Sequence, residues 1–278
     1  MRSEKGIQKA VFYYIMLTLF IVSCKKNAVY ADLESLPSDP GGEQSSFYLG
    51  ETDAPYGFYL YIPGGYEQSV TGYPLLIFLH GSGERGNSET DSVELENVLR
   101  YGPPKLISQH KWNPRYPMIV ASPQCHDKRW NPQKIHDFIG YLLENYTINK
   151  SRIYLSGLSM GGFGTFSYLQ TYADTGYVAA AITVCGGGDT TLANRLVNVP
   201  LWAFHGDSDK RVLPIRSIEM VEAINKLNPP VRAKLTIYPG IGHDSWSMTY
   251  DGSGMRKESP DYDPYDMNIY DWLFQYTR

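Results

Sequence analysis

The sequence lacks the features that mark several large classes of protein. Basic residues do not outnumber acidic ones: 25 Lys and Arg stand against 29 Asp and Glu, for a formal net charge of −4, so there is no electrostatic footprint for nucleic acid. The three cysteines and six histidines show no spacing typical of a metal site, and we expect neither a metal nor another cofactor. The N-terminal apolar run, Val11–Val22, covers about a dozen residues, too few to span a hydrocarbon core of roughly 30 Å.

What stands at the N-terminus instead is a targeting signal. Arg2, Lys5 and Lys9 precede the apolar run, as in a secretory signal peptide. The run ends in IVSC, which resembles a bacterial lipobox whose cysteine, here Cys24, becomes the lipidated first residue of the mature protein. We therefore expect residues 1–24 to be a lipoprotein signal peptide and the protein to reach the membrane through this lipid alone. Lys25 favours the outer membrane of a bacterial envelope, on its periplasmic or surface face.

The segment after Cys24 has the composition of a linker. Residues 25–46 are polar, contain Pro37, Pro40 and Gly41-Gly42, and show no periodicity. They predict a flexible tether with a reach on the order of 25 Å. The remaining residues, 47–278, suit one α/β catalytic domain, because a chain with 42% hydrophobic residues can bury a large core.

Short apolar runs alternate with helical patterns along this domain. Several runs lack polar alternation, which is typical of parallel strands buried on both faces; Lys234–Tyr238 alternates and should lie nearer the edge. Stripes at helical spacing over 135–146, 215–227 and 269–276 separate or follow them. The pattern predicts a mostly parallel, doubly wound α/β sheet. The expected strands are Gly57–Ile62, Pro74–His80, Met118–Ser122, Ile153–Leu155, Ala179–Cys185, Leu201–His205 and Lys234–Tyr238.

The chain is organised around Ile153–Gly164, IYLSGLSMGGFG. An apolar run leads into G-x-S-x-G, the pattern of a nucleophile elbow in which a strand turns sharply into a helix. Ser159 would sit at the strained turn, and Gly157 and Gly161 would avoid collisions with neighbouring backbone. Ser159 is therefore the candidate nucleophile.

Two later strand ends supply partners for Ser159. Asp207 and Asp209 follow one strand, and His243 follows the next. The chain order Ser, Asp, His is that of the α/β-hydrolase fold. His243 is the candidate base, and Asp209 is preferred as the acid over Asp207 and Asp189 because a position beyond the Gly206 turn can reach the histidine loop. The remaining strand-end histidines, His80 and His205, are interpreted as structural.

The surroundings of this site are also predicted. The backbone N–H groups of Met160 and of Ser82, in the glycine-rich loop after Pro74–His80, should form the oxyanion hole. Trp130 and Trp246 could line a substrate site. Only about 14 residues separate Cys185 from Pro200, so no cap domain fits, and an open site suits a bulky substrate such as a decorated polysaccharide.

The other two cysteines, Cys125 and Cys185, each follow a central strand. In the strand order usual for this fold two strands lie between them, which places them about 14 Å apart, beyond the reach of a disulfide. We expect both to be reduced.

Several segments taken together resemble a known family. LIFLHGSGERG, SPQC followed by Trp130, RIYLSGLSMGGFGTF, WAFHGDSD and YPGIGHDSW are similar to the bacterial esterases labelled predicted peptidase or phospholipase/carboxylesterase-like, which are related to the acetylxylan and feruloyl esterases of carbohydrate esterase family one. The resemblance implies the α/β-hydrolase fold, Asp209 as the acid of HG-x-x-D, and the Ser82 and Met160 oxyanion hole.

Three functions follow as hypotheses. The first is a serine esterase that removes acetyl or feruloyl groups from plant polysaccharide, with an acylated polysaccharide or oligosaccharide as its partner. The second is a serine peptidase of the prolyl-oligopeptidase kind, which would use the same triad. The third is a glycan-binding lipoprotein with an inactive hydrolase fold, which an intact Ser159, Asp209 and His243 argue against.

Overall fold

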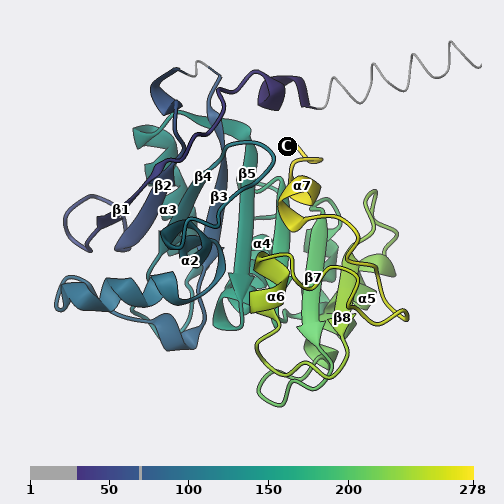
Figure 1. Cartoon of the computed structure of the whole chain (residues 1–278). Coiled ribbons are helices and arrows are strands. Elements are labelled where there is room, and N and C mark those ends of the chain that lie inside the picture. Colours follow the sequence, from purple (N-terminus) through teal and green to yellow (C-terminus); the bar gives the residue numbers. More distant parts are fainter. Residues whose placement is uncertain (1–29, 69–70) are drawn as a thin grey trace, which may run out of the picture.

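The computed structural model of the protein describes residues 30–68 and 71–278. This part of the chain forms one eight-stranded sheet in the order β1-β2-β4-β3-β5-β6-β7-β8, which runs across Figure 1 from β1 at one edge to β8 at the other. The predicted strands are all present, and Lys234–Tyr238 is the edge strand β8. The strands are β1 (Glu43–Phe47), β2 (Phe58–Ile62), β3 (Tyr73–Leu79), β4 (Ile119–Pro123), β5 (Ile148–Leu158), β6 (Ala180–Val184), β7 (Leu201–Gly206) and β8 (Lys234–Tyr238).

Most of the sheet is parallel, as the buried apolar runs predict. β4, β3, β5, β6, β7 and β8 are parallel to their neighbours in that order. β1 and β2 extend the sheet in antiparallel pairing. Because the parallel strands point the same way, their carboxyl ends, where the candidate site residues follow, meet at one edge of the sheet.

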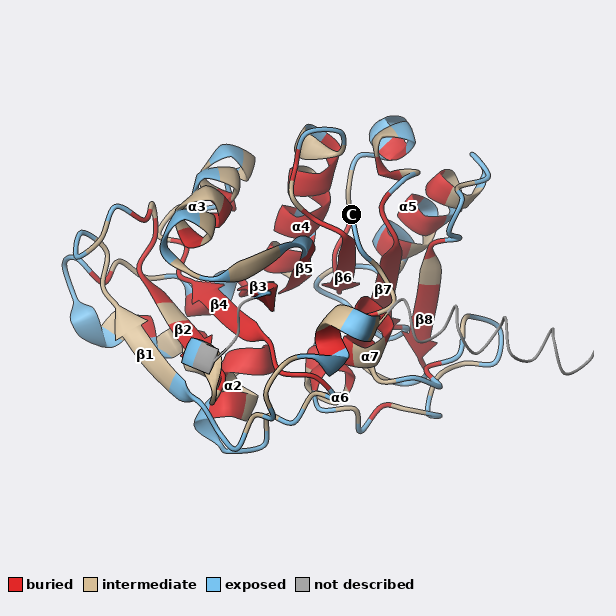
Figure 2. Cartoon of the chain, turned by 90° about the horizontal axis from the view of Figure 1, so that it is seen from above, coloured by how far each residue is buried: buried red, intermediate tan, exposed pale blue. Residues whose placement is uncertain are grey.

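Helices cover both faces of the sheet (Figure 2). One face carries α3 (Pro132–Asn145), α4 (Met160–Tyr172) and α5 (Ile215–Asn225), and the other carries α2 (Gly102–Ser108), α6 (Trp246–Tyr250) and α7 (Ile269–Leu273). Alternate residues of β3 enter two separate cores: Leu75 and Ile77 face one, and Leu76 and Phe78 face the other. The doubly wound prediction is confirmed. Short 3-10 helices η1 (Tyr66–Gln68), η2 (Ser82–Glu84), η3 (Ser92–Arg100) and η4 (Thr190–Leu196) occupy connections.

The predicted tether over 25–46 is wrong for residues 30–46. β1 pairs with β2 along its whole length, and Leu33 is buried in the core. Asp32 lies 2.5 Å from the guanidinium of Arg152, which is only 1% exposed and needs a buried counter-charge. The polar sequence of β1 hid this packing, because an edge strand does not need an apolar face on both sides. The folded domain therefore begins before Phe47.

Other N-terminal predictions lie outside the described residues. These are the signal peptide over 1–24, the lipidated Cys24 and the start of the tether at Lys25. In the part of the chain that the structure describes, no helix has the length and apolar character needed to cross a membrane.

The connection from β6 to β7 contains η4 as its only helix among residues 185–200, so no cap domain is inserted there, as predicted. Cys125 follows β4 and Cys185 follows β6. The strands β3 and β5 lie between them, also as predicted, and both cysteines are free.

Candidate active site

Ser159 stands at the strained turn from β5 into α4. Its backbone has φ 50° and ψ −114°, a conformation that is costly for a residue with a side chain. A Cβ on Gly157 would lie 2.3 Å from the carbonyl oxygen of Gly161, and one on Gly161 would lie 1.9 Å from that of Leu79. Both positions therefore require glycine, and the turn holds the Ser159 hydroxyl clear of the sheet.

The three predicted polar residues meet in one hydrogen-bonded chain. Ser159 Oγ lies 3.0 Å from His243 Nε2, and His243 Nδ1 lies 2.6 Å from Asp209 Oδ2. Since a carboxylate can only accept, Nδ1 carries the proton of the neutral ring and Nε2 is free to accept one from Ser159. This is the geometry that a hydroxyl needs to become a nucleophile.

Asp209 is the acid that the fold presents to the histidine. It is 2% exposed, and its second oxygen accepts N–H bonds from Arg211 (2.8 Å) and Val212 (3.0 Å). Burial opposes its ionisation, but these bonds and the one from His243 outweigh burial and lower its pKa. The carboxylate is therefore charged at neutral pH.

The two alternative acids have other partners. Asp207 is exposed and accepts the N–H of Gly240 at 2.8 Å, which braces the loop that leads to His243. Asp189 caps η4 by accepting the N–H of Thr191. The choice of Asp209 thus agrees with the geometry.

His205 contacts the same carboxylate as His243. Its Nε2 lies 3.2 Å from Asp209 Oδ2 and 2.8 Å from the carbonyl oxygen of Val212, so Nε2 faces two acceptors and carries the proton. Burial lowers the pKa of His205 and keeps the ring neutral. The sequence suggested only a histidine in a tight turn. The spacing of four residues in HGDSD was the signal that places it against the acid.

His80 holds the loop that is expected to form the oxyanion hole. Its Nε2 accepts the N–H of Cys125 at 2.9 Å, so its Nδ1 donates to the carbonyl oxygen of Gly81 at 2.6 Å. A Cβ on Gly81 would lie 3.6 Å from the Cβ of Ser159, so this loop passes beside the nucleophile.

The two expected oxyanion donors begin helices at this point. Ser82 is the first residue of η2, and Met160 is the first residue of α4. N–H groups in a first helical turn have no partner within the helix and are oriented to receive negative charge.

A cavity of about 690 Å³ opens beside Ser159. Trp130 lines it, but is 4% exposed and donates its indole N–H to the His80 carbonyl oxygen. Trp246 does not line it: the indole is buried and meets the His243 ring edge-on at 5.0 Å. The cavity is lined by Arg129, Trp130, Ser159, Met160, Phe163, Gly164, Ser167, Gln170, Gly187, Gly188, Asp189 and Arg216.

Three of these lining residues carry chemistry that the sequence analysis did not single out, namely Arg129, Phe163 and Arg216. Phe163 could have been found, because it follows Ser159 by four residues and so shares a face of the helix with the nucleophile. The arginines come from two distant segments that only the folded chain brings together.

One group near the triad has the composition of a metal site. Ligand atoms of Cys185, His205 and Asp209 lie within 4.8 Å of one another. Hydrogen bonds already engage them: Asp209 binds both histidines, and the Cys185 thiol donates to the His243 carbonyl oxygen at 3.0 Å. Burial raises the pKa of Cys185 to about 12, so the thiol stays protonated. We interpret the group as a brace for the histidine loop.

A model of the phospholipase/carboxylesterase family matches residues 67–251. The chain belongs to this family. Its matched region includes the elbow, the acid and the base, and excludes the N-terminal segment with β1 and β2. The family and fold expected from the sequence motifs are thereby confirmed.

Two relatives share more than a quarter of their aligned residues with the chain. A bifunctional acetylxylan esterase/xylanase from Neocallimastix patriciarum is 27% identical over 149 residues, which are 52% of this chain and 20% of that protein. The structure of a thermostable esterase is 28% identical, covers 85% of this chain and 63% of its own, and superposes with a TM-score of 0.62. The chain thus spans about a fifth of the first relative and under two thirds of the second.

A more distant structure shares the fold alone. The feruloyl esterase module from Clostridium thermocellum, complexed with sinapinate, is 18% identical with a TM-score of 0.55, over 86% of this chain and 89% of that one.

Proposed function

We propose that the protein is a serine carboxylic-ester hydrolase. The observation that carries the proposal is the continuous chain Ser159–His243–Asp209, with hydrogen bonds of 3.0 and 2.6 Å, at the mouth of a cavity in a fold of the carboxylesterase family. Oxygen nucleophiles need an adjacent base, and the base needs an oriented carboxylate. All three are present in the required order.

The reaction follows from these positions. His243 Nε2 takes the Ser159 proton as Oγ attacks the ester carbonyl carbon, and the developing oxyanion is stabilised by the N–H groups of Met160 and Ser82. His243 then gives the proton to the departing alcohol oxygen, and an acyl-enzyme remains on Ser159. Water, deprotonated by His243, attacks the acyl carbon and releases the carboxylic acid.

For the substrate we propose an acetyl or feruloyl ester on plant polysaccharide. The absence of a cap between residues 185 and 200 leaves the site open to a polymer. A relative named as an acetylxylan esterase/xylanase supports the same class. A serine peptidase would use the same triad, but the described residues form one sheet with its helices and contain no propeller.

A substrate panel tests this function. Wild type and Ser159→Ala are assayed on 4-nitrophenyl acetate, methyl ferulate, acetylated xylan and a proline-containing chromogenic peptide. We expect wild type to hydrolyse the esters and not the peptide, and Ser159→Ala to lose this activity. Turnover that survives in Ser159→Ala would disprove the mechanism. Cleavage of the peptide alone would favour the peptidase, and glycan binding without turnover would favour the inactive fold.

We further propose that Cys24 carries a lipid that anchors the protein in a bacterial envelope, the outer membrane being the expected site. The folded domain includes Leu33, so only residues 25–29 separate Cys24 from the described chain. Five residues span at most about 18 Å, which would keep the domain near the membrane. Radiolabelled palmitate should label the wild type and not Cys24→Ser, and label retained in the variant would disprove the anchor.

A further inference from the structure

The cavity beside Ser159 differs in charge from the protein as a whole. The chain carries a formal net charge of −4, yet two arginines, Arg129 and Arg216, line this cavity together with one carboxylate, Asp189. The Oδ1 atom of Asp189 is already engaged, since it accepts from both the N–H and the hydroxyl of Thr191 at 2.9 and 2.7 Å. The walls therefore present a net positive charge to a bound molecule.

Both arginines are available to such a molecule. Three arginines of the described residues pair with carboxylates: Arg152 with Asp32, Arg195 with Asp174 and Arg232 with Asp263. Arg129 and Arg216 are exposed, and within residues 30–68 and 71–278 neither guanidinium makes an ion pair or a side-chain hydrogen bond. Two guanidinium groups without an ion-pair partner in one cavity form a recognition element for an anion.

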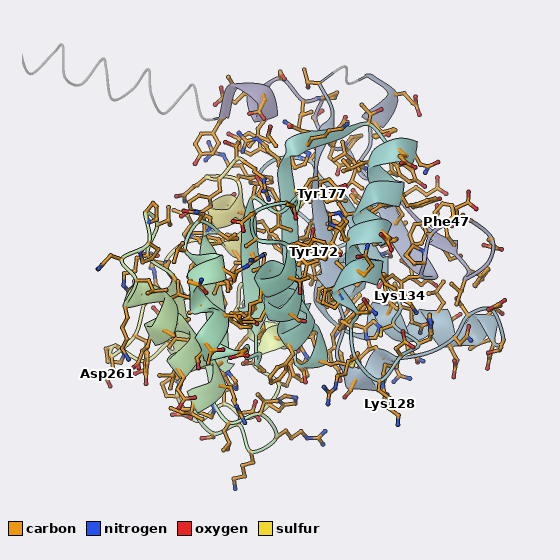
Figure 3. The ribbon with its side chains drawn as sticks, turned by 180° about the vertical axis from the view of Figure 1, so that it is seen from behind. Phe47, Lys128, Lys134, Tyr172, Tyr177 and Asp261 are labelled. Carbon is orange, nitrogen blue, oxygen red and sulfur yellow. The ribbon has the colours of Figure 1, made fainter. Side chains whose placement is uncertain are left out.

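The positive charge continues outward from the cavity. A neighbouring hollow shares Arg129 and Trp130 and adds Lys128 and Lys134. Lys134 is neutralised by Asp127 at 2.9 Å, whereas Lys128, in the loop before α3 (Figure 3), lines the same hollow. An acidic chain approaching Ser159 along this hollow would meet positive charge before it reaches the nucleophile.

Gly187 leaves space between two side chains that line the cavity, Arg216 and Phe163. A Cβ on Gly187 would lie 2.9 Å from the Cβ of Arg216 and 3.1 Å from the ring of Phe163, so Gly187 lies between the base of the Arg216 side chain and the aromatic ring. Phe163 is 39% exposed. A cavity lined by both an aromatic ring and arginines suits a sugar ring that bears a carboxylate, because the sugar can pack on the aromatic ring and the carboxylate can pair with an arginine.

We propose that this cavity is a subsite for the uronate group of an acidic, acylated oligosaccharide. Arg129 and Arg216 would pair with the uronate carboxylate, and Phe163 would pack against the sugar ring, which places a neighbouring acyl ester at Ser159. The proposal deepens the proposed esterase function and rests on it for the fate of the ester. The binding itself does not depend on catalysis.

Binding is therefore measured with Ser159→Ala protein, by calorimetry. The probes are two matched acetylated xylo-oligosaccharides, one with a single glucuronate substituent and one without. We expect the acidic probe to bind about tenfold more tightly, as a charge-assisted bidentate pair implies, and the preference to shrink in 0.5 M NaCl. In Ser159→Ala/Arg129→Gln/Arg216→Gln the two probes should bind equally.

The matched control is Lys226→Gln in the same Ser159→Ala background. Lys226 is an exposed cation at the end of α5, the helix that carries Arg216, and does not line the cavity; its loss should leave the preference unchanged. Melting temperatures show whether each variant is folded.

Several results would overturn the subsite. These are equal affinity for the two probes, no binding of either, or a preference that persists without both arginines. Failure of the esterase function is a separate result: wild type would not hydrolyse 4-nitrophenyl acetate, while the difference in binding between the probes would remain.

Discussion

The dipeptide His-Gly occurs at the carboxyl ends of two strands, and the two copies hold different parts of the site. His80-Gly81 follows β3, and His205-Gly206 ends β7. Both imidazoles are buried, and burial lowers the pKa of each. His80 donates from Nδ1 to the backbone of the loop beside Ser159, whereas His205 donates from Nε2 to the carboxylate of Asp209.

The difference shows how one local sequence acquires two roles. A neutral imidazole has a single N–H, and the acceptor that the fold places nearby decides which nitrogen carries it. At His80 the N–H of Cys125 occupies Nε2, so only Nδ1 can donate. At His205 the carbonyl oxygen of Val212 and Asp209 both face Nε2. One histidine therefore fixes the expected oxyanion loop, and the other fixes the acid.

The largest effect on kcat is expected at Asp209, the acid that His205 contacts. Asp207, in the same loop, should have little effect. Asp209→Asn should lower kcat about 10,000-fold, because an amide cannot stabilise the imidazolium and favours the wrong tautomer. Asp207→Asn is the matched control. Asp207 is exposed and braces Gly240, so kcat should change less than about threefold, in line with other surface substitutions. Steady-state hydrolysis of 4-nitrophenyl acetate measures both. Equal losses in the two variants would show that the loop, and not the Asp209 carboxylate, is what matters.

The two histidines also show which features can be predicted from the sequence and which cannot. The central strands, the elbow and the order Ser159, Asp209, His243 followed from patterns that depend on neighbours in the chain. β1 was missed because EQSSF is a polar edge strand. The polar start of β5 was also missed. Arg152 lies in it, and its charge can be buried only because Asp32, 120 residues away in the sequence, pairs with it.

The roles of the paired histidines were out of reach for a similar reason. Nothing near His80 in the sequence indicates that Cys125 will occupy its Nε2. The arginines of the cavity were missed because Arg129, in the loop before α3, and Arg216, on α5, line one cavity only after these helices have packed on the same face of the sheet (Figure 2). Burial and partner identity are properties of the folded chain.

The second prediction concerns the loop that His80 holds. His80→Gln keeps an acceptor at the position of Nε2 for the N–H of Cys125 but loses the donor to Gly81. His80→Asn keeps a donor at the position of Nδ1. We expect kcat to fall about 100-fold in His80→Gln, within the range for loss of one oxyanion donor, with little change in KM. His80→Asn should retain most of the wild-type kcat. If both variants lose activity equally, His80 serves only the packing of the core.

The third prediction uses the low pKa that the buried histidines share. Burial lowers the pKa of His80 to about 4 from its ordinary 6.5, so between these values the unfolded chain binds a proton that the folded chain does not. The free energy of unfolding should therefore rise by about 3 kcal/mol between pH 4 and 6.5, and His205 should add to it in the same direction.

Urea unfolding at pH 4.5 and 7 measures this rise. In His80→Asn, which removes the titrating ring, the difference between the two pH values should shrink markedly. An unchanged difference would mean that other groups, and not His80, cause the acid sensitivity.

The smallest effect on kcat is expected at His205. The same two substitutions test it, but their expected outcomes are reversed. Here Gln places its amide near the position of Nε2 and keeps a donor to Asp209, whereas Asn loses it. His205→Asn should lower kcat about tenfold, the cost of one hydrogen bond to a charged group, and His205→Gln should lower it less. If the same substitution, either Asn or Gln, preserves activity at both positions, the two histidines donate from the same nitrogen. They would then differ only in location.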